Sequence, residues 1–150
     1  MTSRDKIESF LVRASLTYEK SGDAAWVVRD SVKGVHNLLI MLVDSLVVMR
    51  TTVMSVPRSG AAALYEELLR LNATDMVHGA YALDGQSVII IDTLEAETLD
   101  IEEFEASIDA IGLALAQHRE IEGAAGHGVV RAGGDMGPAQ NDRKAGGKGF

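Results

Sequence analysis

The segment from Leu64 to Leu94 constrains the fold most, because it holds a helix followed by two strands joined by a tight turn. Its helical stripe consists of Leu64, Leu68 and Leu71, and Tyr65 and Leu69 widen it. Asn72 stands where this stripe stops, and we expect it to be the helix C-cap, since asparagine tolerates the left-handed backbone there. Asp84-Gly85 lies between two β-rich runs, which is a strong hairpin signal. This half of the chain is therefore expected to form an antiparallel pair packed against a helix.

A second β-rich block precedes this segment. Its three runs are residues 25–30, 35–43 and 46–54. They are separated only by short polar breaks such as Lys33-Gly34 and Asp44-Ser45. Parallel pairing needs a crossover of about a dozen residues or more, so these breaks predict an antiparallel meander.

Helical periodicity and a capping pattern predict two further helices. The first covers residues 3–19, with an apolar face made of Ile7, Phe10, Leu11, Ala14 and Tyr18. The last begins after Asp100 and runs to about Ile121, because Asp100 and Glu103 have the spacing of a capping box. The predicted order is α-β-β-β-α-β-β-α, an α+β domain with a five-stranded antiparallel sheet over residues 1–122.

Residues 123–150 differ in composition from the rest. They hold nine of the 15 glycines and few large apolar side chains. We expect a flexible glycine-rich tail here.

Composition excludes several classes of partner and compartment. With 150 residues, 47% of them hydrophobic, the chain suits one domain with a substantial core. The formal charge of -8 would repel phosphate backbones and anionic lipid, so neither nucleic acid nor membrane is an expected partner. The chain has no cysteine, and its first ten residues lack the apolar region of an export signal. A cytoplasmic protein is therefore expected.

No catalytic, metal or cofactor site is predicted. The four histidines, at positions 36, 78, 118 and 127, have no metal-ligand spacing. The glycine-rich run at residues 123–128 follows a helix and opens none, unlike a phosphate-binding loop. The acids after Leu99 serve as cap and dipole partners. The sequence thus argues against an enzyme.

Two strands carry apolar residues on both faces, namely 38–43 and 88–91. An antiparallel sheet with one face in water should alternate instead. If all three helices cover one face, the other keeps a large apolar patch, which usually marks an interaction site. The residues we expect to bind a partner are Leu38, Ile40, Met41, Leu46, Val48 and Met54. The alternative is that a helix crosses behind the sheet and the surplus is ordinary core.

The sequence also resembles a known superfamily. One helix is expected to end with the pattern Leu68-Leu69-Arg70-Leu71-Asn72. A small-residue strand at 79–83, a turn and an apolar strand follow it. Leu99-Asp100 then opens a helix that contains Glu103 and Phe104. This arrangement resembles the YbjN-like proteins and the type III secretion chaperones of the CesT/Tir kind, over residues 3–121.

The resemblance implies a homodimer that binds a protein or peptide client without catalysis, along apolar grooves and exposed strand edges. The leading hypothesis is therefore a chaperone-like protein-binding module. The alternative is a regulatory or scaffold domain, of the sensory-transduction regulator type, that binds one folded partner.

Overall fold

The structure is a computed structural model that describes the backbone of residues 1–126 and the side chains of residues 1–119. Its elements follow in the order α1 (Ser3–Arg13), β1 (Tyr18–Lys20), β2 (Ala25–Asp30), β3 (Val35–Val43), β4 (Leu46–Ser55), α2 (Ala61–Thr74), β5 (Ala80–Asp84), β6 (Ser87–Glu95) and α3 (Ile101–Gly126). Residues 1–115 form one compact unit. Among the described helices, none combines the length and apolar character needed to span a bilayer.

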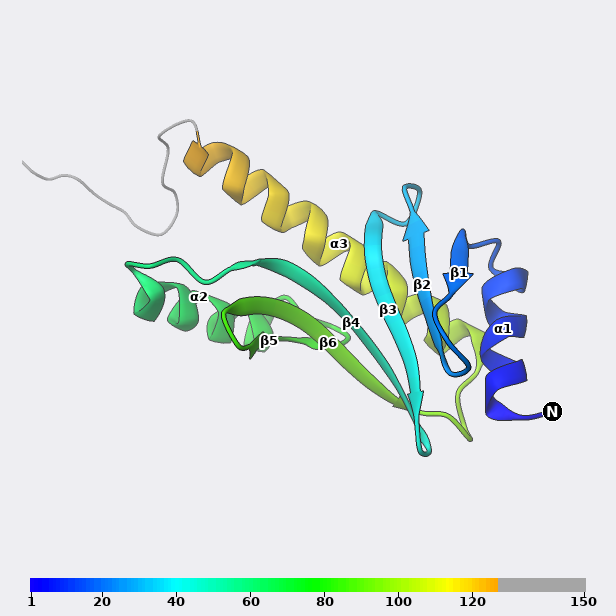
Figure 1. The fold of residues 1–150 in the computed structure, drawn as a ribbon. Coiled ribbons are helices and arrows are strands. Elements are labelled where there is room, and N and C mark those ends of the chain that lie inside the picture. Colours follow the sequence, from blue (N-terminus) through cyan, green and yellow to red (C-terminus); the bar gives the residue numbers. More distant parts are fainter. Residues whose placement is uncertain (127–150) are drawn as a thin grey trace, which may run out of the picture. The chain divides into compact units, whose positions relative to one another are not determined.

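The first unit is built on an antiparallel sheet with the strand order β1-β2-β3-β4-β6-β5 (Figure 1). The predicted meander of β2, β3 and β4 is confirmed. The predicted hairpin of β5 and β6 is confirmed too, with Asp84 opposite Ser87 and Gly85 at φ 59° in the turn. The α+β class is therefore right, but the sheet has six strands instead of five.

The extra strand is β1, which the sequence assigned to the first helix. That helix ends at Arg13 because Ser15 adopts a φ of 57°, and the Leu16 N–H then bonds the Leu11 carbonyl. Tyr18 keeps its apolar role but fulfils it from a strand, opposite Val28. Helical spacing alone could not distinguish one long helix from a shorter helix followed by a strand.

The second helix also differs from its prediction. It runs to Thr74, with Asp75 as its C-cap, so Asn72 lies inside the helix.

The third helix begins as predicted, since the Glu103 N–H donates to Asp100 Oδ1 at 2.7 Å. It continues to Gly126, five residues past the predicted end at Ile121. The rest of the predicted tail, residues 127–150, lies outside the described residues.

All three helices of the first unit cover the same face of the sheet (Figure 1). The register places Trp26, Ile40 and Met49 side by side on that face, and all three are fully buried. Phe10 of α1 and Phe104 of α3 meet there, with ring centroids 5.4 Å apart. Tyr81 of β5 and Leu68 of α2 extend the same core towards the other end of the sheet.

Candidate functional site

The first candidate site is the opposite face of the sheet, which no helix of residues 1–115 covers (Figure 1). One row across the strands contains Val27, Leu39, Arg50 and Ile91. The next contains Met41 and Val48. We define the open face by the half-buried apolar residues Val27, Leu39, Met41, Val48 and Ile91.

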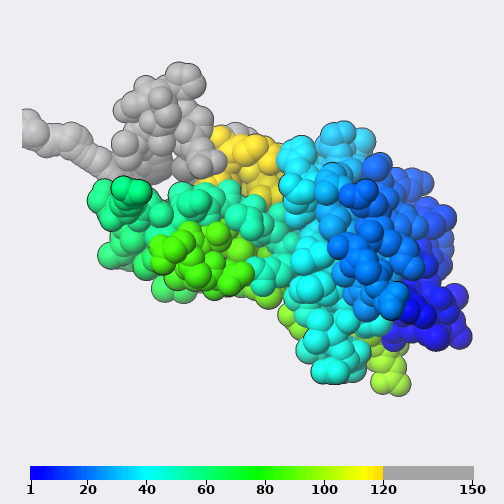
Figure 2. Space-filling view, in the orientation of Figure 1, coloured from blue at the N-terminus to red at the C-terminus, as the bar shows by residue number. Residues whose placement is uncertain are grey.

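These side chains come from four neighbouring strands and therefore form one continuous patch. Figure 2 shows this side of the molecule, with strand residues coloured from blue through cyan to green at the surface. Isolated exposed apolar residues need no explanation, but a contiguous patch on a sheet face is typical of an interaction site.

Two arginine side chains on the open face are already paired with acids. The Arg50 guanidinium bonds the Asp84 carboxylate, and Arg29 bonds Glu19 and the Asn37 side chain. The aliphatic stem of Arg50 adds apolar surface beside Leu39 and Ile91. An apolar partner could thus cover Leu39 and Ile91 without leaving the Arg50 charge buried and unpaired, which would be costly.

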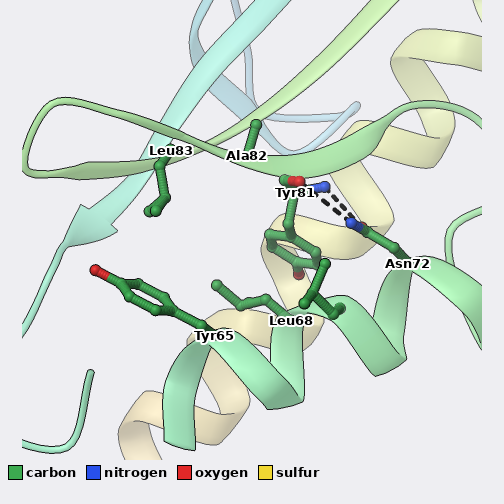
Figure 3. Close-up of a pocket in the computed structure, with 7 residues that line it drawn as sticks. Tyr65, Leu68, Asn72, Tyr81, Ala82 and Leu83 are labelled. Atoms are coloured by element: carbon green, nitrogen blue, oxygen red, sulfur yellow. Dashed lines mark hydrogen bonds between the residues drawn. The ribbon is translucent and has the colours of Figure 1, made fainter. Parts of the chain in front are cut away.

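The second candidate site is a groove of about 340 Å³ between α2 and β5 (Figure 3). Its lining is mostly apolar and consists of Tyr65, Leu68, Leu69, Asn72, Tyr81, Ala82 and Leu83. Two of these side chains are strongly exposed for leucine, with 68% of Leu69 and 50% of Leu83 accessible. The groove therefore lies between two projecting apolar side chains.

Asn72 joins the two walls of this groove. The Tyr81 N–H donates to Asn72 Oδ1 at 2.7 Å, and Asn72 Nδ2 donates to the Tyr81 carbonyl at 3.2 Å (Figure 3). One side chain thus satisfies both backbone groups of Tyr81, as a neighbouring strand would.

Tyr81 lies in the floor of the groove. Burial raises the pKa of its phenol above the usual value, and the nearby Asp75 carboxylate acts in the same direction. The ring therefore stays neutral at physiological pH and contributes an apolar surface.

The structure separates the predicted partner-binding residues into two groups. Met41, Leu46 and Val48 are half-buried and lie on the side of the open face. Leu38 and Ile40 point to the covered face and have no exposed surface, so they cannot contact a partner in this conformation. Met54 packs against the core opposite Val88, because a register shift between Thr52 and Met54 turns it to the covered side.

The prediction omitted Val27, Leu39 and Ile91 from the open face, and Leu69 and Leu83 from the groove. Leu39 and Ile91 belong to the two-faced apolar runs, so alternation combined with the correct register would have found them. Leu69 was counted as part of the helical stripe, and only tertiary packing shows that it faces outward.

The described residues hold no group of three or more His, Cys, Asp or Glu side chains that could bind a metal ion. His36 lies in β3, and His78 lies in the connection between α2 and β5. Neither histidine lines the groove.

A family model matches most of the chain. The model of CesT_Tir_1 covers residues 2–122. The chain belongs to the CesT_Tir_1 family. The resemblance seen in the sequence is thereby confirmed, and the matched range includes both the open face and the groove of this CesT_Tir_1 member. The sequence matches none of the curated proteins.

Several solved structures share the fold. YbjN from E. coli, a candidate transcription regulator, aligns with a TM-score of 0.60 at 17% identity, over 83% of this chain and 92% of its own. The HopA1–SchA chaperone–effector complex aligns at 0.60 and 8% identity, over 77% and 91%. The ExoU–SpcU complex of the Pseudomonas aeruginosa type III secretion system aligns at 0.54 and 10%, over 75% and 93%. At these identities the likeness establishes the fold of this CesT_Tir_1 protein.

Proposed function

We propose that the protein is a non-enzymatic, chaperone-like module that binds a protein or peptide client. The open face carries this proposal, because a contiguous apolar surface on a sheet is explained by a partner that covers it. The HopA1–SchA structure, which has the same fold and is a chaperone–effector complex, supports it.

The client would place apolar side chains against Leu39, Met41 and Val48. At roughly 25 cal/mol per Å², covering about 400 Å² contributes on the order of 10 kcal/mol before the costs of association. Such contacts are non-directional, and the methionine side chain adapts its shape, so clients of different sequence would fit.

We also propose that the protein acts as a homodimer through the groove between α2 and β5. Leu69 and Leu83 project beside a hollow on the same surface, so each copy offers both the projecting side chain and the space that receives it. Such a self-complementary patch suits a two-fold interface.

The proposed compartment is the cytoplasm, and the proposed partner is protein instead of nucleic acid or membrane. The formal charge of -8 supports this choice, because phosphate groups would be repelled.

A Val48→Glu variant tests the client-binding proposal. The probe is a dye-labelled, unfolded polypeptide of zero net charge in which leucine alternates with serine and glycine, with affinity read from fluorescence anisotropy. Wild-type protein should bind it, and a carboxylate in the open face should weaken binding at least about tenfold, because the client would bury an unpaired charge. Val32→Glu is the matched control, since Val32 is 92% exposed in the turn between β2 and β3. Equal affinities of Val48→Glu and wild type would refute this use of the face.

A second candidate function is a regulatory or scaffold domain for one folded partner. The structural similarity to YbjN favours it. A scaffold would ignore the unfolded probe and retain a single folded protein from the native lysate, whereas a chaperone would bind the probe.

A further inference from the structure

We propose that Arg50 binds a carboxylate of the client, and that Asp84 occupies this position until the client arrives. When an acidic side chain of the client replaces Asp84, Ile89 is uncovered and joins the open face. The partner is therefore a polypeptide segment that carries an acidic side chain between apolar ones. This inference rests on the proposed protein-binding function and names the chemistry that the open face selects.

Ile89 is buried although it lies on the open side of the sheet. It is two residues from Ile91 in β6, so both side chains point to the same face, and each stands opposite an alanine of β5. The residues on either side of it, Val88 and Ile90, belong to the core under the helices. Ile91 is half-buried, whereas only 3% of Ile89 is accessible. Another side chain of the open face must therefore cover Ile89.

The Arg50 side chain provides this cover. Arg50 lies in β4 and stands opposite Ile91 of β6. Its guanidinium bonds the carboxylate of Asp84, which lies in β5 and stands opposite Ser87 of β6. Because β6 lies between β4 and β5, a side chain that joins these two positions must cross β6 midway, and Ile89 lies there. We call the ion pair of Arg50 and Asp84 the strap.

The strap can exchange one carboxylate for another. Arg50 is its more buried member, with 30% of the side chain accessible, against 61% for Asp84. Among residues 1–119, the guanidinium forms one hydrogen bond, through Nη2 to Asp84. The remaining N–H donors of its planar fork can bind a second carboxylate. Asp84 is exposed, so once released it is hydrated, and the exchange leaves no charge buried and unpaired.

The net charge of the chain makes this selectivity measurable. A formal charge of -8 repels an acidic segment, so an acidic peptide should bind less well than a neutral twin unless a local cation attracts it. A preference for the acidic twin therefore reports a cation on the binding surface. Arg29, which bonds Glu19 and Asn37, is another cation of the open face and supplies the matched controls.

The first measurement tests the cover over Ile89 in the full-length protein. Isoleucine methyl groups are labelled with carbon-13, and a neutral gadolinium chelate in solution broadens the NMR signals of methyl groups that reach water. In wild-type protein, the Ile89 signal should be broadened less than that of Ile91. Asp84→Ala releases the strap and Arg50→Gln shortens it, so both should raise the broadening of Ile89 to the level of Ile91. Equal broadening of Ile89 in wild type and Arg50→Gln would overturn the cover.

The second measurement tests the choice of partner. Two short dye-labelled peptides, in which leucine alternates with serine, differ at one central position that is glutamate or glutamine. Fluorescence anisotropy should show that wild-type protein binds the glutamate peptide at least about threefold more tightly, since it gains a charge-assisted hydrogen bond. Asp84→Ala should enlarge this preference, because the competing carboxylate is gone. Arg50→Gln should abolish it, and the net charge should then favour the glutamine peptide.

Glu19→Gln and Arg29→Gln are the matched controls, because they change the net charge as Asp84→Ala and Arg50→Gln do and act on the other ion pair. Both should keep the wild-type preference. Equal binding of the two peptides by wild type, or a preference that survives Arg50→Gln, would overturn the role of Arg50. Neither result affects the proposed function, which is read separately from the neutral polypeptide and Val48→Glu.

Discussion

Trp26 shows how one residue ties the first helix to the sheet. Its ring is fully buried, and its Nε1 donates to Glu8 Oε2 of α1 at 3.1 Å. Lys20 of β1 reaches the same oxygen at 3.1 Å. Glu8 thus accepts bonds from two strands, which favours its charged form. The hydrogen bond from Trp26 is the larger cause and the bond from Lys20 the second, and together they hold the pKa of the Glu8 carboxyl below its usual value.

This arrangement predicts a pH dependence. A carboxyl group with a lowered pKa in the folded state contributes stability above its unfolded value of 4.5, and that contribution is lost as the pH falls through the folded value. Glu8→Gln keeps an acceptor for Trp26 but cannot titrate. Between about pH 6 and pH 3, its unfolding free energy should therefore fall less steeply than that of wild type.

Urea unfolding followed by tryptophan fluorescence measures this difference, because Trp26 is the only tryptophan in the chain. Glu19→Gln is the control, since Glu19 is an exposed acid paired with Arg29 on β1. Identical slopes for wild type and Glu8→Gln would show that the Trp26 bond does not select the charged carboxylate.

Among the elements, α3 and the turn between β2 and β3 meet at two glycines. A Cβ placed on Gly112 would stand 1.9 Å from the Lys33 carbonyl oxygen, and one on Gly34 would stand 3.4 Å from the Gly112 carbonyl oxygen. Lys33 Nζ also bonds Asp109 Oδ1 at 2.7 Å. The turn therefore lies directly on the helix backbone, and only glycine permits this approach.

Gly112→Ala should destabilise the fold by about 1–3 kcal/mol or more, because the turn must move away from the helix. Helix propensity alone would predict the opposite, a gain of about 1 kcal/mol. The free energy of urea unfolding gives the sign. Leu113→Ala, at a neighbouring side chain that is 62% exposed, should change stability little. A Gly112→Ala protein as stable as wild type would show that this close approach is not required.

The same elements show what the sequence could predict. Runs with period 2 and the short breaks between them gave the meander and the Asp84-Gly85 hairpin, because both depend on local chemistry. The strand at Tyr18–Lys20 was assigned to a helix, because an apolar residue at helical spacing also fits a short strand facing the same core. Asn72 was interpreted locally as a cap, whereas its carboxamide binds Tyr81, a contact that only the tertiary structure creates.

The sequence predicted an apolar sheet face as the candidate site, but it identified only some of the residues on that face. A surplus of apolar surface on one face follows from the composition of two strands, and the structure places all three helices of residues 1–115 on the other face. Which of the residues 38–43 face outward depends on the register. The prediction therefore included Leu38 and Ile40, which are buried, and omitted Leu39, which lies on the open face.

For the whole molecule, the oligomeric state decides how many open faces act together. A dimer through the groove would leave the open face accessible, because the exposed side chains of Leu69 and Leu83 belong to α2 and the β5 edge. Leu69→Asp should shift the protein from a dimer towards the 16.0 kDa monomer, since it would bury a charge against Leu83 of the other copy. Sedimentation equilibrium at micromolar concentration measures the dissociation constant, which we expect to rise at least about tenfold.

Salt dependence separates this interface from one held by ion pairs. Two chains of formal charge -8 repel each other. An apolar interface should therefore tighten when added salt screens that repulsion, whereas one built on opposite charges should weaken. Leu113→Asp is the matched control, because Leu113 is also an exposed leucine on a helix but does not line the groove. A Leu69→Asp protein that remains dimeric, or a wild-type dimer that dissociates in salt, would place the contact between copies on a different surface.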